Sequence, residues 1–177
     1  FLQPYDGSHS ATFTYLGGAG DDVFTQPDPG SGGNSILAGS GYDTLNMSGH
    51  SNTTELDGVY GVEHVSVSGG DVNVTLSAGL TSPNVPLYVK VDATTSSFAW
   101  NASSVSDSIQ FIDARAMTTG VDIHGTSGAD FLYGGSDDDT LNAEMNNYPG
   151  GTPEFIYGGA GADTLSGNSS AFDIYYY

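Results

Sequence analysis

The chain has no cysteine, so disulfide bonds contribute nothing to its fold. Basic residues are almost absent as well, because Lys90 and Arg115 stand against 21 acidic residues and the net charge is −19. Without a basic patch to contact phosphates, we expect no nucleic-acid partner. The same acidity disfavours binding to anionic membrane surfaces. No apolar run approaches the length of a membrane span, so we expect no direct membrane insertion.

Motifs for catalysis are also missing. There is no HExxH motif, no GxSxG elbow and no cysteine nucleophile. No zinc-site spacing relates the four histidines, which are His9, His50, His64 and His124. Acidic pairs such as Asp21-Asp22 resemble glycosidase carboxylates, but their glycine-rich surroundings favour metal ligation. We therefore predict that the protein is not an enzyme, and that His64 is a surface or packing residue.

Signals for helices are scarce. Instead, short segments alternate between apolar and polar residues and are bounded by turn-forming residues. The clearest of these segments are residues 12–16, 62–67, 72–76 and 87–91. The sequence therefore predicts an all-β protein.

Glycine and aspartate are abundant, and they form a nine-residue pattern. Its sixth position is always aspartate and its eighth is apolar. Two copies follow each other directly, so that Asp130 and Asp139 are nine residues apart. The five copies are residues 17–25, 38–46, 125–133, 134–142 and 158–166. A constant offset from aspartate to an apolar residue in five copies argues against ordinary surface turns.

Each position of the pattern has a physical role. The glycines permit positive φ and let backbone carbonyls turn toward a common centre. The aspartate adds a charged oxygen, and calcium is coordinated by carboxylate and carbonyl oxygens together. The apolar residue is buried only if neighbouring turns stack. These inward-pointing residues are Phe24, Leu45, Leu132, Leu141 and Leu165.

The acidic residues are mostly short. Seventeen are Asp and only four are Glu, whereas a surface selected for solubility would mix charge signs and use Glu freely. Two carboxylates about 4 Å apart repel each other by roughly 4 kcal/mol at an effective dielectric constant near 20. Stacked turns should therefore be poorly stable without a divalent cation. Because millimolar calcium suits weak sites, we expect an extracellular or cell-surface location.

In these nonapeptides the chain resembles the RTX repeat proteins of bacteria, most of all the calcium-binding parts of their surface-layer proteins and large adhesins. The resemblance implies a right-handed parallel β-roll or β-helix solenoid that binds Ca²⁺. It implies carboxylate ligands from Asp22, Asp43, Asp130, Asp139 and Asp163. The implied sources of carbonyl ligands are Gly18, Gly20, Gly39, Gly41, Gly128, Gly135, Asp137, Gly159 and Gly161.

The chain departs from the RTX pattern at several positions. Ala38, Thr126 and Asp137 replace expected glycines, and Asp173 falls one residue out of phase, so that it is a doubtful ligand. The first two copies are not in adjacent phase, so their sites are either incomplete or shared with residues outside this chain. The chain starts at Phe1 without Met, which we interpret as a piece of a longer protein.

Three segments are predicted within what is most simply one continuous solenoid. Residues 1–48 form N-terminal calcium-binding coils, residues 49–120 a strand-rich, calcium-poor part, and residues 121–177 a C-terminal calcium-binding β-roll. A separate β-sandwich in the middle is the alternative. Segments 91–94 and 112–115 look like copies of one element 21 residues apart, which suggests a coil of about 20 residues. Residues 142–155 interrupt the repeat and are predicted to form a loop.

Two further features concern partners. Five Asn-x-Ser/Thr sequons, at Asn46, Asn52, Asn73, Asn101 and Asn168, offer sites for attached glycans. Apolar residues lie at both ends of the chain, in Phe1-Leu2 and Tyr175–Tyr177. Because an uncapped solenoid end is an open strand edge, we expect a homo-oligomer or fibre that forms through the solenoid ends.

These features favour a calcium-rigidified structural protein of an extracellular layer, filament or adhesin. The alternative is a calcium-dependent secretion and folding module of an RTX exoenzyme or toxin, whose catalytic domain would lie upstream. A third hypothesis is carbohydrate binding through exposed aromatic residues, for which the sequence suggests Trp100, Tyr148 and Tyr157.

Overall fold

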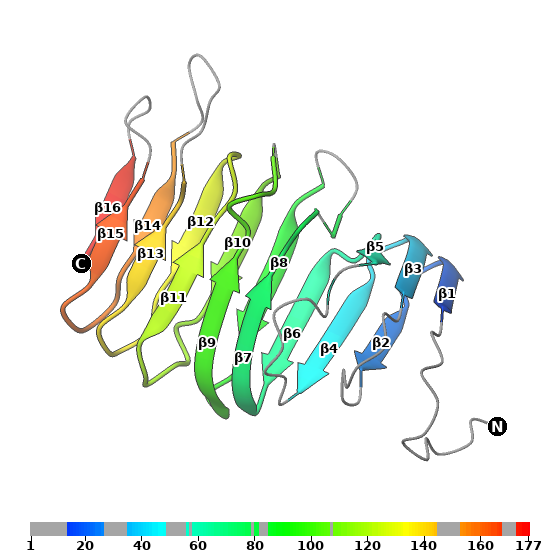
Figure 1. Ribbon diagram of the computed structural model, residues 1–177, viewed down its shortest axis with the longest axis horizontal. Coiled ribbons are helices and arrows are strands. Elements are labelled where there is room, and N and C mark those ends of the chain that lie inside the picture. The colour runs from blue at the N-terminus through cyan, green and yellow to red at the C-terminus, as the bar shows by residue number, and fades with distance from the viewer. Residues whose placement is uncertain are drawn as a thin grey trace.

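Parallel β-strands build the described part of the protein. The computed structural model describes residues 14–26, 35–48, 56, 58–78, 80–81, 85–106, 108–144, 153–167 and 173–177. Every strand pairing in these segments is parallel, and none of the segments is a helix long and apolar enough to cross a membrane. The predicted all-β class and the parallel solenoid are thereby confirmed (Figure 1).

The strands form three sheets. The largest runs along the whole solenoid and contains β2 (Val23–Gln26), β4 (Thr44–Ser48), β6 (His64–Ser68), β8 (Leu87–Val91), β10 (Gln110–Asp113), β12 (Asp130–Tyr133), β14 (Phe155–Tyr157) and β16 (Ile174–Tyr176). A five-stranded sheet contains β7 (Gly70–Thr75), β9 (Thr95–Asn101), β11 (Val121–His124), β13 (Thr140–Asn142) and β15 (Thr164–Ser166). A three-stranded sheet contains β1 (Thr14–Ala19), β3 (Ser35–Ser40) and β5 (Val59–Tyr60).

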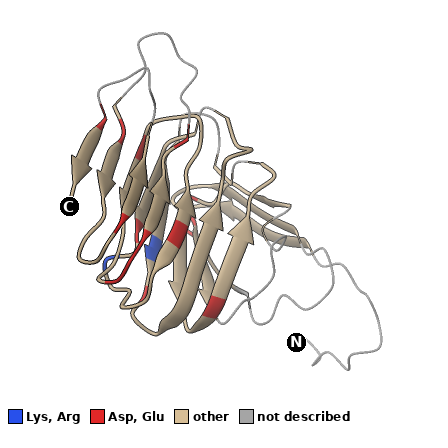
Figure 2. Ribbon diagram, turned by 60° about the vertical axis from the view of Figure 1, so that its left-hand side comes forward, with Lys and Arg blue, Asp and Glu red and all other residues tan. Residues whose placement is uncertain are grey.

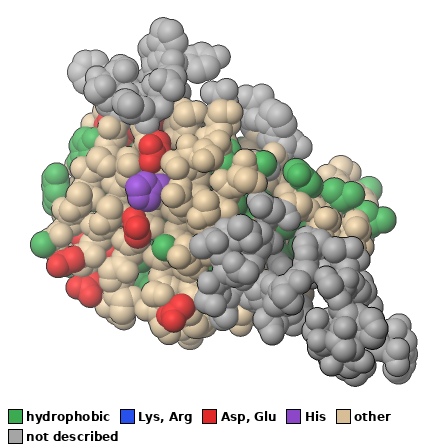
Figure 3. All heavy atoms as spheres, in the orientation of Figure 1, with side chains coloured by type: hydrophobic (Ala, Val, Ile, Leu, Met, Phe, Trp, Pro, Cys, Tyr) green, Lys and Arg blue, Asp and Glu red, His purple; other side chains and the backbone are tan. Residues whose placement is uncertain are grey.

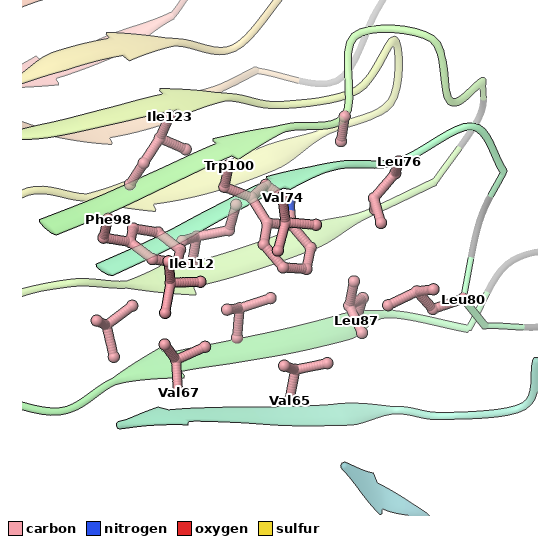
Figure 4. Packing of buried hydrophobic residues seen from close by; sticks show 14 of the residues in the cluster. Val65, Val67, Val74, Leu76, Leu80, Leu87, Phe98, Trp100, Ile112 and Ile123 are labelled. Carbon is pink, nitrogen blue, oxygen red and sulfur yellow. The ribbon is translucent and has the colours of Figure 1, made fainter. Parts of the chain in front are cut away.

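The core lies between the eight-stranded sheet and the other sheets. Strands such as β6 and β8 alternate buried and more exposed residues, as the period of two requires when one face is buried. Their buried side chains stack from rung to rung (Figure 4). On the eight-stranded sheet this inward column consists of Leu45, Val65, Val89, Ile112, Leu132 and Ile156.

Trp100 is the largest side chain of this core. It has no exposed surface, so the hypothesis that it is an exposed sugar-binding residue is wrong. Its ring stacks on Phe98 with centroids 6.3 Å apart, and its indole N–H donates to Gln110 Oε1 at 3.1 Å. The strand pattern explains this position, because Phe98 and Trp100 are two residues apart and share the inward face of β9.

We therefore predict that Trp100→Ala lowers the free energy of unfolding by about 3–5 kcal/mol, because a large buried ring is replaced by a cavity. Tyr60→Ala removes an exposed aromatic ring and is the control; we expect a change within about 0.5 kcal/mol. Urea denaturation of both variants at saturating calcium measures the effect. Equal losses in the two variants would contradict the prediction.

The register determines which residues occupy equivalent rungs. Successive coils advance by 21 residues between Asp22 and Asp43 and by 24 between Asp130 and Glu154. Segments 91–94 and 112–115, which look like copies of one element, do not occupy equivalent rungs, because Ile112 pairs with Val89 and Asp113 with Lys90. Both segments contain the same local turn, in which Asp92 and Asp113 accept a hydrogen bond from the backbone N–H two residues later. This local turn produced the similarity in sequence.

Candidate calcium-binding turns

The five nonapeptides lie at two different corners of the solenoid. The first corner leads into the eight-stranded sheet, and Asp22, Asp43 and Asp130 lie there, at the starts of β2, β4 and β12. The second corner leads from that sheet into the five-stranded sheet and contains Asp139 and Asp163, before β13 and β15. Asp130 and Asp139 are close in sequence, yet they lie at opposite ends of β12. The copies that stack directly are therefore the first on the second and the fourth on the fifth.

Both stacked pairs have the same hydrogen-bond pattern. At the first corner the N–H of Asp22 donates to Asp43 Oδ1 at 2.8 Å, and the N–H of Tyr42 donates to Asp21 Oδ1 at 2.8 Å. At the second corner, equivalent bonds join Asp139 N–H to Asp163 Oδ1 at 3.0 Å and Ala162 N–H to Asp138 Oδ1 at 2.7 Å. The two pairs are far apart in sequence, so the nonapeptide itself specifies this geometry.

Glycines allow the paired turns to approach each other closely. Gly39 and Gly41 have φ of 108° and 148°, and a Cβ on either would collide with the carbonyl oxygen of Gly18 or Gly20. At the second corner the same relation joins Gly159, at φ 113°, to the carbonyl oxygen of Gly135. Gly161 packs in the same way against the backbone of Asp137. Carbonyl oxygens of one turn thus lie against the next turn, where only glycine fits.

This arrangement fits a calcium ion. Among the described residues no three His, Cys, Asp or Glu side chains are grouped for a metal, so most ligands would have to be backbone oxygens. Calcium accepts such mixed sets of carbonyl and carboxylate oxygens. Asp43 Oδ2 is buried and has no hydrogen-bond partner within the described structure, which leaves an anionic oxygen without compensation. The stacked glycine turns and this carboxylate oxygen together supply the two kinds of oxygen that calcium accepts.

Asp130 is held differently from Asp43. Its Oδ2 accepts the N–H of Thr126 at 2.6 Å and its Oδ1 accepts the N–H of Gln110 at 2.9 Å, so the chain itself binds both oxygens. Burial raises the pKa of the Asp130 carboxyl well above its ordinary value, although these backbone hydrogen bonds oppose the shift. A Cβ on Gly128 would meet the carbonyl oxygen of Ser108, whose turn has no nonapeptide. Asp130 therefore lacks the paired turn that the other copies have.

Asp139 resembles Asp130 in its hydrogen bonds to backbone N–H groups, and it resembles Asp43 in belonging to a pair of stacked turns. The N–H groups of Val121 and Gly135 donate to its two carboxylate oxygens at 2.8 Å and 2.6 Å. Burial raises its pKa and Asp163 adds to the shift, while the two backbone hydrogen bonds oppose it. A cation beside Asp139 and Asp163 would relieve this unfavourable environment for negative charge.

The column of acceptors at the first corner is longer than the nonapeptides indicate. Glu63, Glu154 and Asp173 occupy its remaining acidic rungs, and each accepts a hydrogen bond from the backbone N–H of the previous rung. The bonds join Asp43 N–H to Glu63 at 2.8 Å, Asp130 N–H to Glu154 at 2.6 Å and Glu154 N–H to Asp173 at 3.3 Å. Sequence analysis missed Glu63 and Glu154 as members of this column and treated Asp173 as out of phase. The sequence signal that could have identified these residues is an acidic residue immediately before a segment that alternates between apolar and polar residues.

The other predicted positions are distributed as follows. Asn73 is exposed on β7, whereas Asn46 and Asn101 are partly buried. Asn52, Asn168 and Tyr148 lie outside the described residues, as do His9, His50 and the Phe1-Leu2 end. The predicted loop at residues 142–155 also lies partly outside them. His64 is partly buried and stacks on Tyr42, with ring centroids 6.5 Å apart.

Charge is distributed unevenly over this scaffold. Figure 2 shows acidic residues mostly near the ends of the strands, where the two corners lie, and both cations close to each other in the ribbon. The described surface of the face in Figure 3 shows acidic side chains and no Lys or Arg.

The fold and the paired turns together define a parallel β-solenoid whose corners have the composition and close stacking of calcium-binding turns. Residues 122–147 and 148–171 match the model of the RTX calcium-binding nonapeptide repeat (4 copies), so this part of the chain is similar to RTX repeats. The two N-terminal copies lie outside the matched residues and are assigned from their sequence pattern and their equivalent hydrogen bonds. No curated protein and no solved structure shows significant similarity to the chain.

Proposed function

We propose that the protein is a non-catalytic, calcium-rigidified structural element of an extracellular layer, filament or adhesin. The observation that carries this proposal is the pair of equivalent stacked turns near either end of the solenoid, joined by one continuous eight-stranded sheet. Ions bound at both ends would fix the first and last coils of a single elongated body. A rod that stiffens in calcium is the property that such assemblies need.

The chemistry of the chain supports an extracellular role. A net charge of −19 opposes compaction, and each bound calcium ion removes two units of that charge. Weak calcium sites are filled where calcium is millimolar, which is outside the cell. RTX repeat proteins are typically secreted, in agreement with this reasoning. Calcium would thus convert a poorly folded acidic chain into a folded one after export.

Self-association through the solenoid ends is the second part of the proposal. In the described residues β1 and β2 form one edge and β15 and β16 the other, each with one unpaired side. Apolar side chains are exposed at both edges: Leu16 is 72% exposed and Tyr176 is 56% exposed. Such edges favour pairing with a further strand, and a second copy of the chain supplies one.

We predict that the protein forms larger particles in millimolar calcium and that excess chelator disperses them. Leu16→Lys should reduce assembly strongly, because a lysine on an edge strand blocks strand addition. Leu37→Lys is the matched control, since Leu37 pairs in register with Leu16 on the inner strand β3. Analytical ultracentrifugation and negative-stain microscopy measure the particle size. A folded monomer at all calcium concentrations would contradict self-association and would favour the secretion and folding module.

A further inference from the structure

The outer face of the eight-stranded sheet carries a column of aromatic rings. The register aligns Tyr88 with Phe111, Phe131 and Phe155 on successive strands. Their ring centroids are 4.8 Å apart between Tyr88 and Phe111, 4.3 Å between Phe111 and Phe131, and 4.8 Å between Phe131 and Phe155. None of these rings belongs to the core, because each lies next to an inward-facing residue of its strand. The column therefore forms an apolar ridge on the surface.

A second column runs parallel to this ridge, two residues further along the same strands. Lys90, Asp113 and Tyr133 occupy successive rungs of it. Arg115 extends from the turn after β10 and lies over the Tyr133 ring, 4.9 Å from its centroid. Between the ridge and this polar column is a groove with a volume of about 340 Å³. Tyr88 and Phe111 of the ridge line it, together with Lys90, Asp113 and Arg115.

Both cations of this acidic chain line the groove. Within the described residues the Lys90 side chain makes no hydrogen bond or ion pair, so its ammonium group is available to a ligand. Arg115 donates from Nε and Nη2 to Asp113 at 2.8 Å and 2.7 Å, and its other guanidinium N–H groups have no acceptor among the described residues. The pKa of Asp113 is lowered mainly by this hydrogen bond, and Lys90 adds to the shift. The groove thus combines fixed donors, an acceptor and apolar rings.

We propose that this groove binds a saccharide that carries a carboxylate, such as a uronic acid residue. The carboxylate would lie at Lys90 and the free N–H groups of Arg115, which is the charge-assisted contact that such groups favour. Asp113 would accept hydrogen bonds from sugar hydroxyls, and the C–H face of the sugar would lie against Tyr88. The volume is at the small end of ligand pockets, about 300–1,000 Å³, and suits one or two sugar rings. This activity goes beyond the structural role and does not depend on self-association.

Charge complementarity is the reason for choosing an anionic ligand. Elsewhere the surface is acidic and repels carboxylates, but charges farther away than about 8–10 Å are largely screened at physiological salt. A carboxylate in the groove would therefore interact mainly with the charged groups that line it: Lys90 and Arg115 attract it and Asp113 repels it, which leaves a net charge of +1 among these three. A second copy of the chain is the competing occupant, since its acidic turns would also be attracted to Lys90 and Arg115.

The test compares a trimer of galacturonic acid with its methyl ester by isothermal titration calorimetry, in calcium. The ester lacks the negative charge of each carboxylate and carries a methyl group in its place. We expect the free acid to bind and the ester to bind about tenfold more weakly or not at all. Equal heats for the two ligands, or no binding of the acid, would overturn the proposal.

Substitutions in the groove test which residues bind the carboxylate of the saccharide. Lys90→Gln should weaken binding of the acid about tenfold by removing one charge-assisted contact, and Lys90→Arg should retain it. Asn73→Asp is the matched control, because it makes the same change in net charge on the exposed side of β7, away from the groove. Unchanged binding in Lys90→Gln would overturn the proposal. Sedimentation provides a second way to overturn it. If the wild type forms a dimer without saccharide and Lys90→Gln dissociates that dimer, a second copy of the chain occupies the groove.

Discussion

Excess chelator should abolish most of the β-sheet circular dichroism signal of this protein, and added calcium should restore it. Stability of a domain is only about 5–15 kcal/mol. A ligand at about a hundred times its dissociation constant contributes about 2.7 kcal/mol per site, so two turn sites would account for a large share of that total. Removing the ions also restores the repulsion within a chain of net charge −19. Magnesium should be a poor substitute, because it requires a tighter octahedral shell.

Asp43→Asn and Asp130→Asn separate the role of calcium from that of the fold. Asp43 has one oxygen without a partner among the described residues, so an amide there keeps the hydrogen bond from Asp22 N–H on its oxygen, places its NH₂ group where no existing hydrogen bond is broken, and loses the charge. We expect Asp43→Asn to need more calcium to fold, with unchanged stability in chelator. Asp130→Asn turns an amide N–H toward a backbone donor and should cost about 1–3 kcal/mol with or without calcium.

Circular dichroism during a calcium titration measures the folding midpoint of each variant. An unchanged spectrum of the wild type in excess chelator would refute a calcium-dependent fold. If Asp43→Asn and Asp130→Asn shifted the midpoint equally, the distinction between a metal ligand and a structural carboxylate would be wrong.

The class of fold could be predicted because local patterns determine it. Alternating β-branched residues in a segment such as 62–67 specify a strand, and the glycine-rich turns specify a change of direction. The nonapeptides could not reveal which turns stack. A spacing of nine residues covers one strand and one turn, so Asp130 and Asp139 lie on opposite corners. Pairing between coils depends on steps of 18 to 26 residues, which vary with the length of the intervening loops.

The candidate site extends beyond its motif for a physical reason. A backbone N–H at the first corner needs an acceptor, and Glu63 satisfies this need as well as Asp43 does. A search for glycine-flanked aspartates finds the nonapeptide members of this column and misses Glu63 and Glu154. The aromatic ridge was missed for a related reason, since Phe111 and Phe131 become neighbours only when the coils are aligned. Trp100 was misplaced because its inward position follows from alternation with Phe98 and not from its type.

Gly39→Ala should damage calcium binding much more than Gly18→Ala does. Both glycines have positive φ, at 108° and 137°, so either alanine adds backbone strain on the order of 1–3 kcal/mol. Only at Gly39 would the new Cβ collide with the carbonyl oxygen of the turn below, that of Gly18. The space around Gly18 is open, and its alanine therefore meets nothing. The difference between the two variants isolates the close approach of the paired turns.

We expect Gly39→Ala to raise the calcium concentration at the folding midpoint about tenfold relative to Gly18→Ala, because the two turns must separate and their carbonyl oxygens no longer share one centre. Isothermal titration calorimetry and urea denaturation at saturating calcium distinguish lost affinity from lost stability. Equal midpoints for the two alanine variants would show that the turns do not share an ion. Gly159→Ala repeats the test at the second corner, where its Cβ would collide with the carbonyl oxygen of Gly135.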